Sequence, residues 1–195
     1  MLEELFERVR GLDPEAGLLC LEAEPDEQSD LWHYVHGSLL RRLGRLKEAV
    51  TAAEKSCALQ PEIGEYRANL GAGLLAQAME HGPEAGADAF YLKSAIAELE
   101  RAVSLEPLLV DGLASLGLAY QLAGRNTEAL VVLDSAVDHD PNHLAAWYNR
   151  ASVLRELDRK EDCLHCLEQA LRIDPQFEPA KISRQRIVTQ RSGSE

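Results

Sequence analysis

The sequence predicts an all-α protein built from tandem helical hairpins, and three observations lead to this fold class. Pro107, Pro141 and Pro175 stand 34 residues apart, and Pro61 fits the same ladder with an offset. Leucine and alanine, both strong helix formers, supply much of the 46% apolar content, whereas β-branched residues are sparse. A small residue also stands twelve positions before each proline. A period of 34 residues that combines small residues with helix breakers indicates stacked repeats. The small residues are Ala49, Ala95, Ala129 and Cys163.

Each period reads as two helices joined by a tight turn. In the clearest one, Gly124 is expected to end the first helix, because glycine enters the left-handed conformation at low cost. Pro141 follows the second helix, which cannot continue through proline. Gly44 is the equivalent stop in the first period, and Asp158 takes its place in the fourth. The apolar face of the clearest first helix, at helical spacing, comprises Leu113, Leu116, Gly117 and Tyr120.

This pattern resembles the tetratricopeptide repeat (TPR), and the resemblance covers residues 30–177. It implies an α-solenoid, a right-handed TPR superhelix of antiparallel helical hairpins. The residues that carry the resemblance in the third and fourth repeats are Leu113, Leu116, Gly117, Tyr120, Ala129, Leu133, Pro141, Trp147, Leu154, Leu167, Ala170 and Pro175.

The expected organisation is one domain with caps at both ends. Residues 1–29 read as a degenerate N-terminal hairpin, residues 178–190 as a C-terminal capping helix and residues 191–195 as a disordered tail. The second of the four repeats, residues 64–109, contains twelve extra residues around its turn. We expect both of its helices to be longer by one to two turns. Phe90 and Tyr91 lie at the base of this insertion, where they either contact a partner or pack against the longer neighbouring helix.

Charge and composition exclude several classes of function. The chain carries 33 acidic and 20 basic side chains and a net charge of −13, which disfavours nucleic-acid binding. The sequence contains no run of 18 apolar residues, so we expect no membrane insertion. The N-terminus lacks the features of a secretory signal. Four unevenly spaced cysteines do not form a disulfide framework, so the expected location is cytoplasmic. The N-terminal end of the chain is acidic and the C-terminal end is basic. Attraction between these ends in different copies leaves a homo-oligomer as an alternative.

No motif predicts catalysis, a cofactor or a metal site. The sequence lacks a phosphate-binding glycine loop, a GxSxG elbow and an HExxH pair, so we expect no enzyme. His139 and His143 have a ligand-like spacing but lie in a turn without further ligands. Cys163 and Cys166 form a CxxC pair. Because Cys163 replaces the buried small residue of the repeat, a core thiol is the simpler interpretation and a redox switch the alternative.

The resemblance to TPR proteins implies that the first helix of each hairpin lines a concave groove that holds a peptide or a partner helix. Asn69 and Asn149 stand where family members often use asparagine to bind a peptide backbone; the alternative is that both are structural polar residues. The residues expected in this groove are Tyr34, Val35, Ser38, Arg41, Asn69, Leu75, Ser115, Leu118, Tyr148, Asn149, Ser152 and Arg155.

Three functions follow as hypotheses. The first is a non-enzymatic scaffold that binds a partner protein in this groove. The second is a dedicated bacterial secretion or assembly chaperone, which would hold an apolar segment of its client. The third is self-assembly through the acidic N-terminal and basic C-terminal ends.

Overall fold

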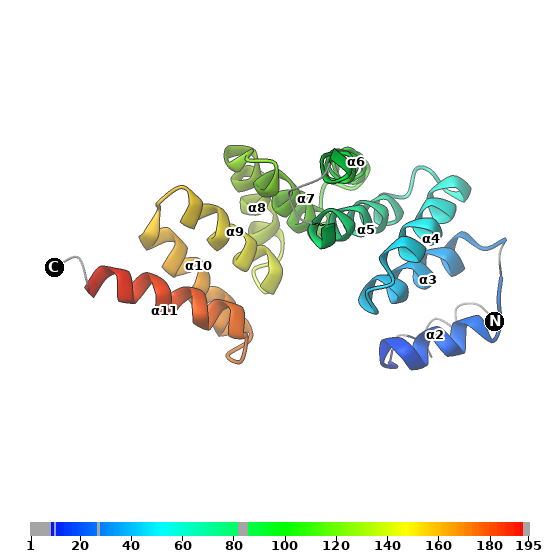
Figure 1. Cartoon of the computed structure of the whole chain (residues 1–195), viewed down its shortest axis with the longest axis horizontal. Coiled ribbons are helices and arrows are strands. Elements are labelled where there is room, and N and C mark those ends of the chain that lie inside the picture. Colours follow the sequence, from blue (N-terminus) through cyan, green and yellow to red (C-terminus); the bar gives the residue numbers. More distant parts are fainter. Residues whose placement is uncertain (1–8, 10, 27, 82–85, 193–195) are drawn as a thin grey trace. The chain divides into compact units, whose positions relative to one another are not determined.

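The computed structural model describes residue 9 and residues 11–26, 28–81 and 86–192. Within these residues the chain is all-α, and successive helices pair as hairpins, which confirms the predicted fold class (Figure 1). The helices are α2 (Pro14–Glu22), α3 (Asp30–Arg42), α4 (Leu46–Leu59), α5 (Gly64–His81), α6 (Gly86–Leu105), α7 (Val110–Leu122), α8 (Asn126–His139), α9 (Leu144–Glu156), α10 (Lys160–Ile173) and α11 (Glu178–Ser192).

The chain divides into two compact units. The N-terminal unit is Met1–Pro107 and the C-terminal unit is Leu108–Glu195. The first contains the hairpins α3–α4 and α5–α6, and the second contains α7–α8 and α9–α10, followed by α11. A repeat contacts mainly its neighbours in sequence, so a repeat chain separates readily at a hairpin boundary.

The turn within each ordinary hairpin depends on one residue with positive φ. Gly44 and Gly124 both have φ of 74°, and Asp158 has φ of 56°, as the sequence predicted from its place in the fourth repeat. In each case the following N–H reaches back to close the helix; Arg159 N, for example, donates to Leu154 O at 2.9 Å. This is the Schellman arrangement, which satisfies carbonyls at the helix end.

Replacing Asp158 by glycine is expected to raise the free energy of unfolding by about 0.5–1 kcal/mol. A side chain in the left-handed region costs energy that glycine avoids. The ion pair that would be lost, Lys160 Nζ to Asp158 Oδ1 at 3.3 Å, is exposed and contributes little. Urea denaturation measures the change, with Gly124→Asp as the reciprocal variant. A stabilising effect of Gly124→Asp would contradict the strain argument.

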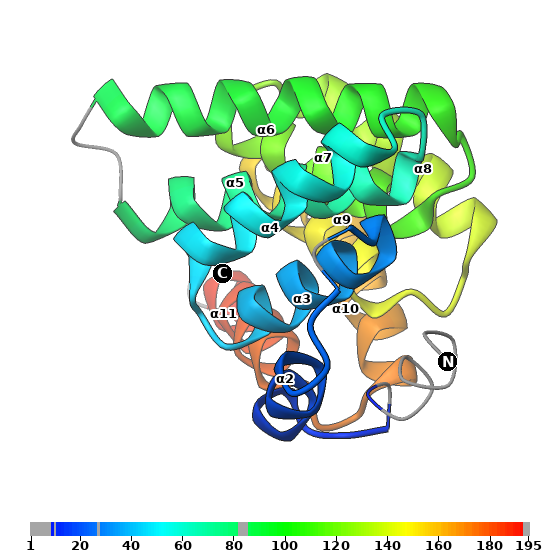
Figure 2. The same cartoon turned by 90° about the vertical axis from the view of Figure 1, so that its right-hand side faces the viewer.

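The second hairpin differs from the others in length. Helices α5 and α6 contain 18 and 20 residues, whereas α3, α7 and α9 contain 13 and α4, α8 and α10 contain 14. They lie side by side, and Figure 2 shows α6 as a long uninterrupted helix. These lengths agree with the extension expected from the twelve extra residues. The connecting residues 82–85 lie outside the described part of the chain.

Each unit has its own apolar core. In the N-terminal unit, Leu21 from α2 and Leu40 from α3 are fully buried in one cluster. In the C-terminal unit, Cys163 lies in the cluster that α9, α10 and α11 form around Leu154 and Leu167. Helix α11 therefore covers the last hairpin, and it runs to Ser192, two residues beyond the expected end. Among the described residues, no helix is both long enough and apolar enough to cross a membrane.

Candidate functional site

The first helices of the hairpins present partly exposed side chains at most of the expected contact positions. In the N-terminal unit, α3 carries Tyr34, whose ring stacks on Tyr66 with centroids 5.0 Å apart. Tyr66 is buried and its hydroxyl donates to Asp30 Oδ2 at 2.8 Å, so Tyr34 packs on a fixed support. The other expected contact positions on α3 are also partly exposed, namely Val35, Ser38 and Arg41.

In the C-terminal unit, the corresponding face is formed by α7 and α9, which pack together. Tyr148 is partly exposed, and its ring meets Phe177 edge-on with centroids 5.2 Å apart. Arg155 is exposed one helical turn beyond Ser152. We call this set the α7–α9 face; it consists of Ser115, Leu118, Tyr148, Ser152 and Arg155.

The two asparagines bind the chain's own backbone. Asn69 Nδ2 donates to Tyr34 O at 3.4 Å, and Asn149 Nδ2 donates to Ala114 O at 3.1 Å. Each amide thus ties one first helix to the first helix of the preceding hairpin, 35 residues earlier. From the sequence, the two asparagines could also be structural polar residues. The structure agrees with that interpretation, because each amide forms a hydrogen bond between successive hairpins.

Leu75 also departs from expectation. Its side chain is only 4% exposed, so it belongs to the core and cannot contact a partner as an apolar anchor. The sequence could not separate these roles, because α5 is apolar on more than one face. Phe90 is 66% exposed and contacts Tyr91 edge-on, with ring centroids 5.9 Å apart. The position at this insertion that was expected to contact a partner therefore carries an exposed aromatic ring, that of Phe90.

A polar network beneath the α7–α9 face was missed in the sequence. The Gln121 amide nitrogen donates to Ser152 Oγ at 2.8 Å and also to Glu156 Oε1. Arg155 donates to the same Ser152 hydroxyl at 3.4 Å. Gln121 is buried, and its Oε1 has no partner among the described residues. In the sequence, a glutamine near the end of a helix is expected to be exposed to solvent. The network is therefore evident only from the packing of α9 on α7.

A cavity of about 240 Å³ adjoins this face where α11 packs beside Arg155. Helix α11, expected only as a cap, contributes Ser183 and Arg186. Three of its lining side chains are cationic, namely Arg155, Lys160 and Arg186, and the lining carboxylate of Asp158 pairs with Lys160. This cation excess makes the cavity suited to an acidic group.

Cys163 and Cys166 are buried thiols. Burial raises the pKa of Cys163 to about 11, and it also raises the pKa of Cys166. Cys163 Sγ donates to Ala151 O at 3.1 Å, so the thiol proton is also engaged in a hydrogen bond. At pH 8, about one Cys163 in a thousand is a thiolate, and the thiolate is the reactive form. This environment favours the core-thiol interpretation over a redox switch.

We expect iodoacetamide to label Cys163 at pH 8 at least about a hundredfold more slowly in the native protein than in urea. The half-buried Cys20 serves as the internal comparison. Equal labelling rates in both states would contradict the buried environment.

The raised pKa of Cys163 also makes the stability depend on pH. Between about pH 9 and 11 the unfolded thiol loses its proton while the folded thiol keeps it, so the free energy of unfolding falls as pH rises.

Of the two histidines that flank the turn before α9, His143 has a structural role. His143 Nδ1 accepts the Ala146 N–H at 3.1 Å and so caps α9. Its Nε2 then carries the proton and lies 2.9 Å from Asp111 Oδ1. Among the described residues, no group of three or more histidine, cysteine or acidic side chains is arranged to hold a metal ion.

Comparison with known proteins agrees with the hairpin architecture. The sequence matches the tetratricopeptide repeat over residues 33–63 and residues 120–186. Anaphase-promoting complex subunit 7 of Dictyostelium discoideum is 30% identical over 138 residues, which is 71% of this chain and 22% of that protein. The chain therefore spans about a fifth of that relative.

Solved structures show the same fold. A thermophilic TPR protein in Thermus thermophilus aligns with a TM-score of 0.79 and 18% identity, over 90% of this chain and 91% of that one. YrrB, a TPR protein with an unusual peptide-binding site, aligns with a TM-score of 0.61 and 24% identity, over 88% and 84% of the two chains. With its repeated hairpins and these matches, the chain belongs to the tetratricopeptide repeat family, whose fold is that of a protein-interaction scaffold.

Proposed function

We propose that this chain is a non-enzymatic scaffold that holds a segment of a partner protein on its α7–α9 face. The observation that carries the proposal is Tyr148, a partly exposed aromatic ring held edge-on against Phe177. Aromatic side chains with restricted rotamers contribute much of the binding energy in protein interfaces. Leu118 adds a partly exposed apolar neighbour on α7.

The network under this face supports the same role. Gln121, Ser152 and Arg155 are linked by hydrogen bonds, so the face is preorganised before a partner arrives. The cations of the neighbouring cavity, Arg155 and Arg186 among them, favour a partner segment that carries acidic residues. In the N-terminal unit, Tyr34 on its Tyr66 support supplies a comparable surface on α3.

The relatives are consistent with a scaffold. One is a subunit of the anaphase-promoting complex, and another, YrrB, has an unusual peptide-binding site. A chaperone for an apolar client is the second candidate. It is favoured by the exposed Phe90 and Met79 on the long hairpin, which are 66% and 56% exposed. Self-assembly through the oppositely charged ends stays a prediction from the sequence.

Photocrosslinking in the native cells tests the scaffold proposal and locates the contact. A benzophenone amino acid replaces Tyr148 on α9 in one variant and Val131 on α8 in a matched control. Val131 is 66% exposed, so the control is more accessible than Tyr148, and a missing crosslink there cannot be due to burial. We expect a discrete crosslinked partner from position 148 and none from position 131. A third variant at Phe90 reports on the chaperone alternative, and a crosslink there alone would contradict the α7–α9 proposal.

A further inference from the structure

The cavity of about 240 Å³ beside the α7–α9 face is built from three helices of the C-terminal unit. Arg155 comes from the last turn of α9, and Lys160 is the first residue of α10. Ser183 and Arg186 lie one helical turn apart on α11. We call this space the α9–α11 cavity. Arg155 and Arg186 are exposed and Ser183 is half-buried, so a ligand can contact all three side chains.

The side chains of the α9–α11 cavity carry an excess of two positive charges, because three cations and one carboxylate line it. That carboxylate belongs to Asp158, which pairs with Lys160 at 3.3 Å and is 82% exposed, so solvent screens its charge. Among the residues that the structure describes, neither Arg155 nor Arg186 forms an ion pair. Arg155 Nη2 donates to Ser152 Oγ at 3.4 Å, and the other N–H groups of this guanidinium remain for a ligand.

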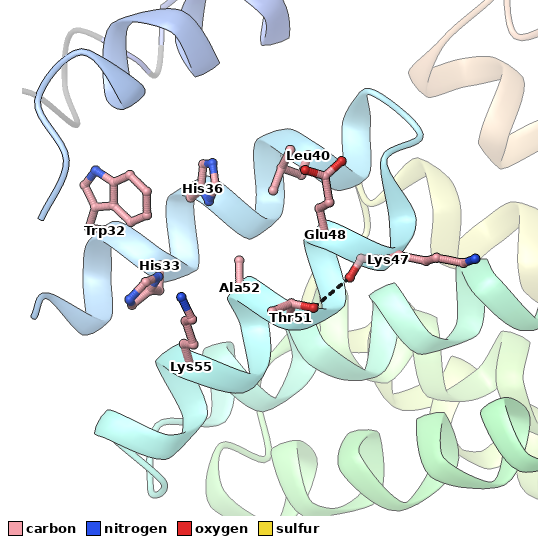
Figure 3. Close-up of a pocket in the computed structure, with 9 residues that line it drawn as sticks. All are labelled: Trp32, His33, His36, Leu40, Lys47, Glu48, Thr51, Ala52 and Lys55. Carbon is pink, nitrogen blue, oxygen red and sulfur yellow. Dashed lines mark hydrogen bonds between the residues drawn. The ribbon is translucent and has the colours of Figure 1, made fainter. Parts of the chain in front are cut away.

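The cavity between α3 and α4 of the N-terminal unit lacks this arrangement. It is larger, at about 360 Å³, but Trp32 and Leu40 are buried, so its floor belongs to the core. Figure 3 shows that its two lysines, Lys47 and Lys55, point in different directions. The α9–α11 cavity is therefore the better candidate for binding an anion.

The α9–α11 cavity adjoins the surface proposed to hold the partner. Arg155 belongs to both. A smaller hollow, lined among others by Tyr148 and Ser152 of α9, shares Arg155 and Ser183 with the cavity. A partner segment that lies over the Tyr148 ring would therefore pass beside the two guanidinium groups.

We propose that the α9–α11 cavity binds the phosphate group of a phosphorylated serine or threonine in the partner segment. The guanidinium groups of Arg155 and Arg186 can each donate two N–H groups to phosphate oxygens, and Ser183 Oγ supplies a further donor. A phosphate monoester carries a charge of about −1.5 to −2 at pH 7, which matches the excess of two cations. A glutamate or aspartate carboxylate would neutralise only one of them. The inference rests on the proposed scaffold function in taking the partner on the α7–α9 face as the source of the phosphate.

Three small probes test the proposal on the whole chain at constant ionic strength. Acetyl-phosphoserine N-methylamide carries the phosphate, acetyl-glutamate N-methylamide is its singly charged match, and inorganic phosphate is the free ion. The readout is the backbone amide signal of Ser183 in nuclear magnetic resonance spectra, with that of Val131 on α8, outside the cavity, as the internal control. We expect saturable shifts of the Ser183 signal with a Kd of about 1 mM for the phosphoserine probe, as suits so small a ligand, and an unmoved Val131 signal.

The glutamate probe is expected to bind about fivefold more weakly, because it offers one charge and one acceptor oxygen fewer. Arg155→Gln and Arg186→Gln should each weaken the phosphoserine probe about fivefold. Arg184→Gln, which removes the same charge from α11 outside the cavity, should change the Kd by less than about twofold. All three arginines are exposed, so circular dichroism should show unchanged helicity in each variant.

Equal affinity for the phosphoserine and glutamate probes, or no shift at Ser183, would overturn the proposal. Equal effects of Arg184→Gln and Arg186→Gln would overturn the assignment to this cavity. Tighter binding of inorganic phosphate than of the phosphoserine probe would overturn the assignment to a partner side chain. A crosslink at Tyr148 without binding of the phosphoserine probe would contradict this inference alone, and binding of the probe without that crosslink would contradict the scaffold proposal alone.

Discussion

Replacing Leu133 by alanine is expected to lower the free energy of unfolding of the C-terminal unit by about 2–5 kcal/mol. Leu133 lies on α8, has 0% of its side chain exposed and packs directly over Gly117 of α7. Truncation removes the transfer energy of the isopropyl group and leaves a cavity between the two helices. The helices cannot close it without shifting the hairpin, so the cost falls in the range of large core deletions.

Urea denaturation followed by circular dichroism measures this loss. The matched control is Val131→Ala, two residues away on the same helix, where the side chain is 66% exposed. We expect the control to change stability by no more than about 0.5 kcal/mol. Comparable effects of the two substitutions would mean that α8 does not bury the face described for it.

Gly117→Leu is expected to destabilise the same unit by about 1–3 kcal/mol through overpacking. A Cβ added at Gly117 would lie 2.7 Å from Leu133 Cδ2 and 2.9 Å from Cδ1, closer than such atoms approach in proteins. Leu133 is enclosed on all sides, so it has little room to move away. The close approach of α7 and α8 therefore depends on the absence of a side chain at this position.

The double variant Gly117→Leu with Leu133→Ala separates overpacking from other causes. If the clash is with Leu133, its removal makes room for the new side chain, and the combined loss is smaller than the sum of the single losses. We expect a coupling free energy of about 0.5–3 kcal/mol, the range for residues in contact. Strict additivity would show that the damage at Gly117 arises elsewhere.

The hairpins and their turns could be predicted because their signals are local. Gly44 and Gly124 end helices through their own backbone conformation, and Asp158 was recognised as a substitute in the same position. The long α5–α6 hairpin followed from counting residues between fixed points of the repeat. The division at Pro107 did not follow, because a regular period carries no information on how firmly successive hairpins pack.

The candidate site could be predicted only in part, because side-chain roles depend on contacts distant in sequence. The sequence around Asn149 is the same whether its amide binds a partner or Ala114 O, 35 residues earlier. Leu75 is apolar in either role, and only its burial decides between core and surface.

The affinity of the crosslinked partner segment for three forms of the chain tests the central claim most directly. Once photocrosslinking at Tyr148 identifies the segment, it is synthesised and titrated by calorimetry against the natural sequence, Tyr148→Ala and Val131→Ala. We predict that Tyr148→Ala weakens binding by at least about tenfold with unchanged helicity, as expected for an aromatic anchor, and that Val131→Ala leaves the affinity unchanged. Equal affinity of all three forms would contradict the proposal that the α7–α9 face holds the partner.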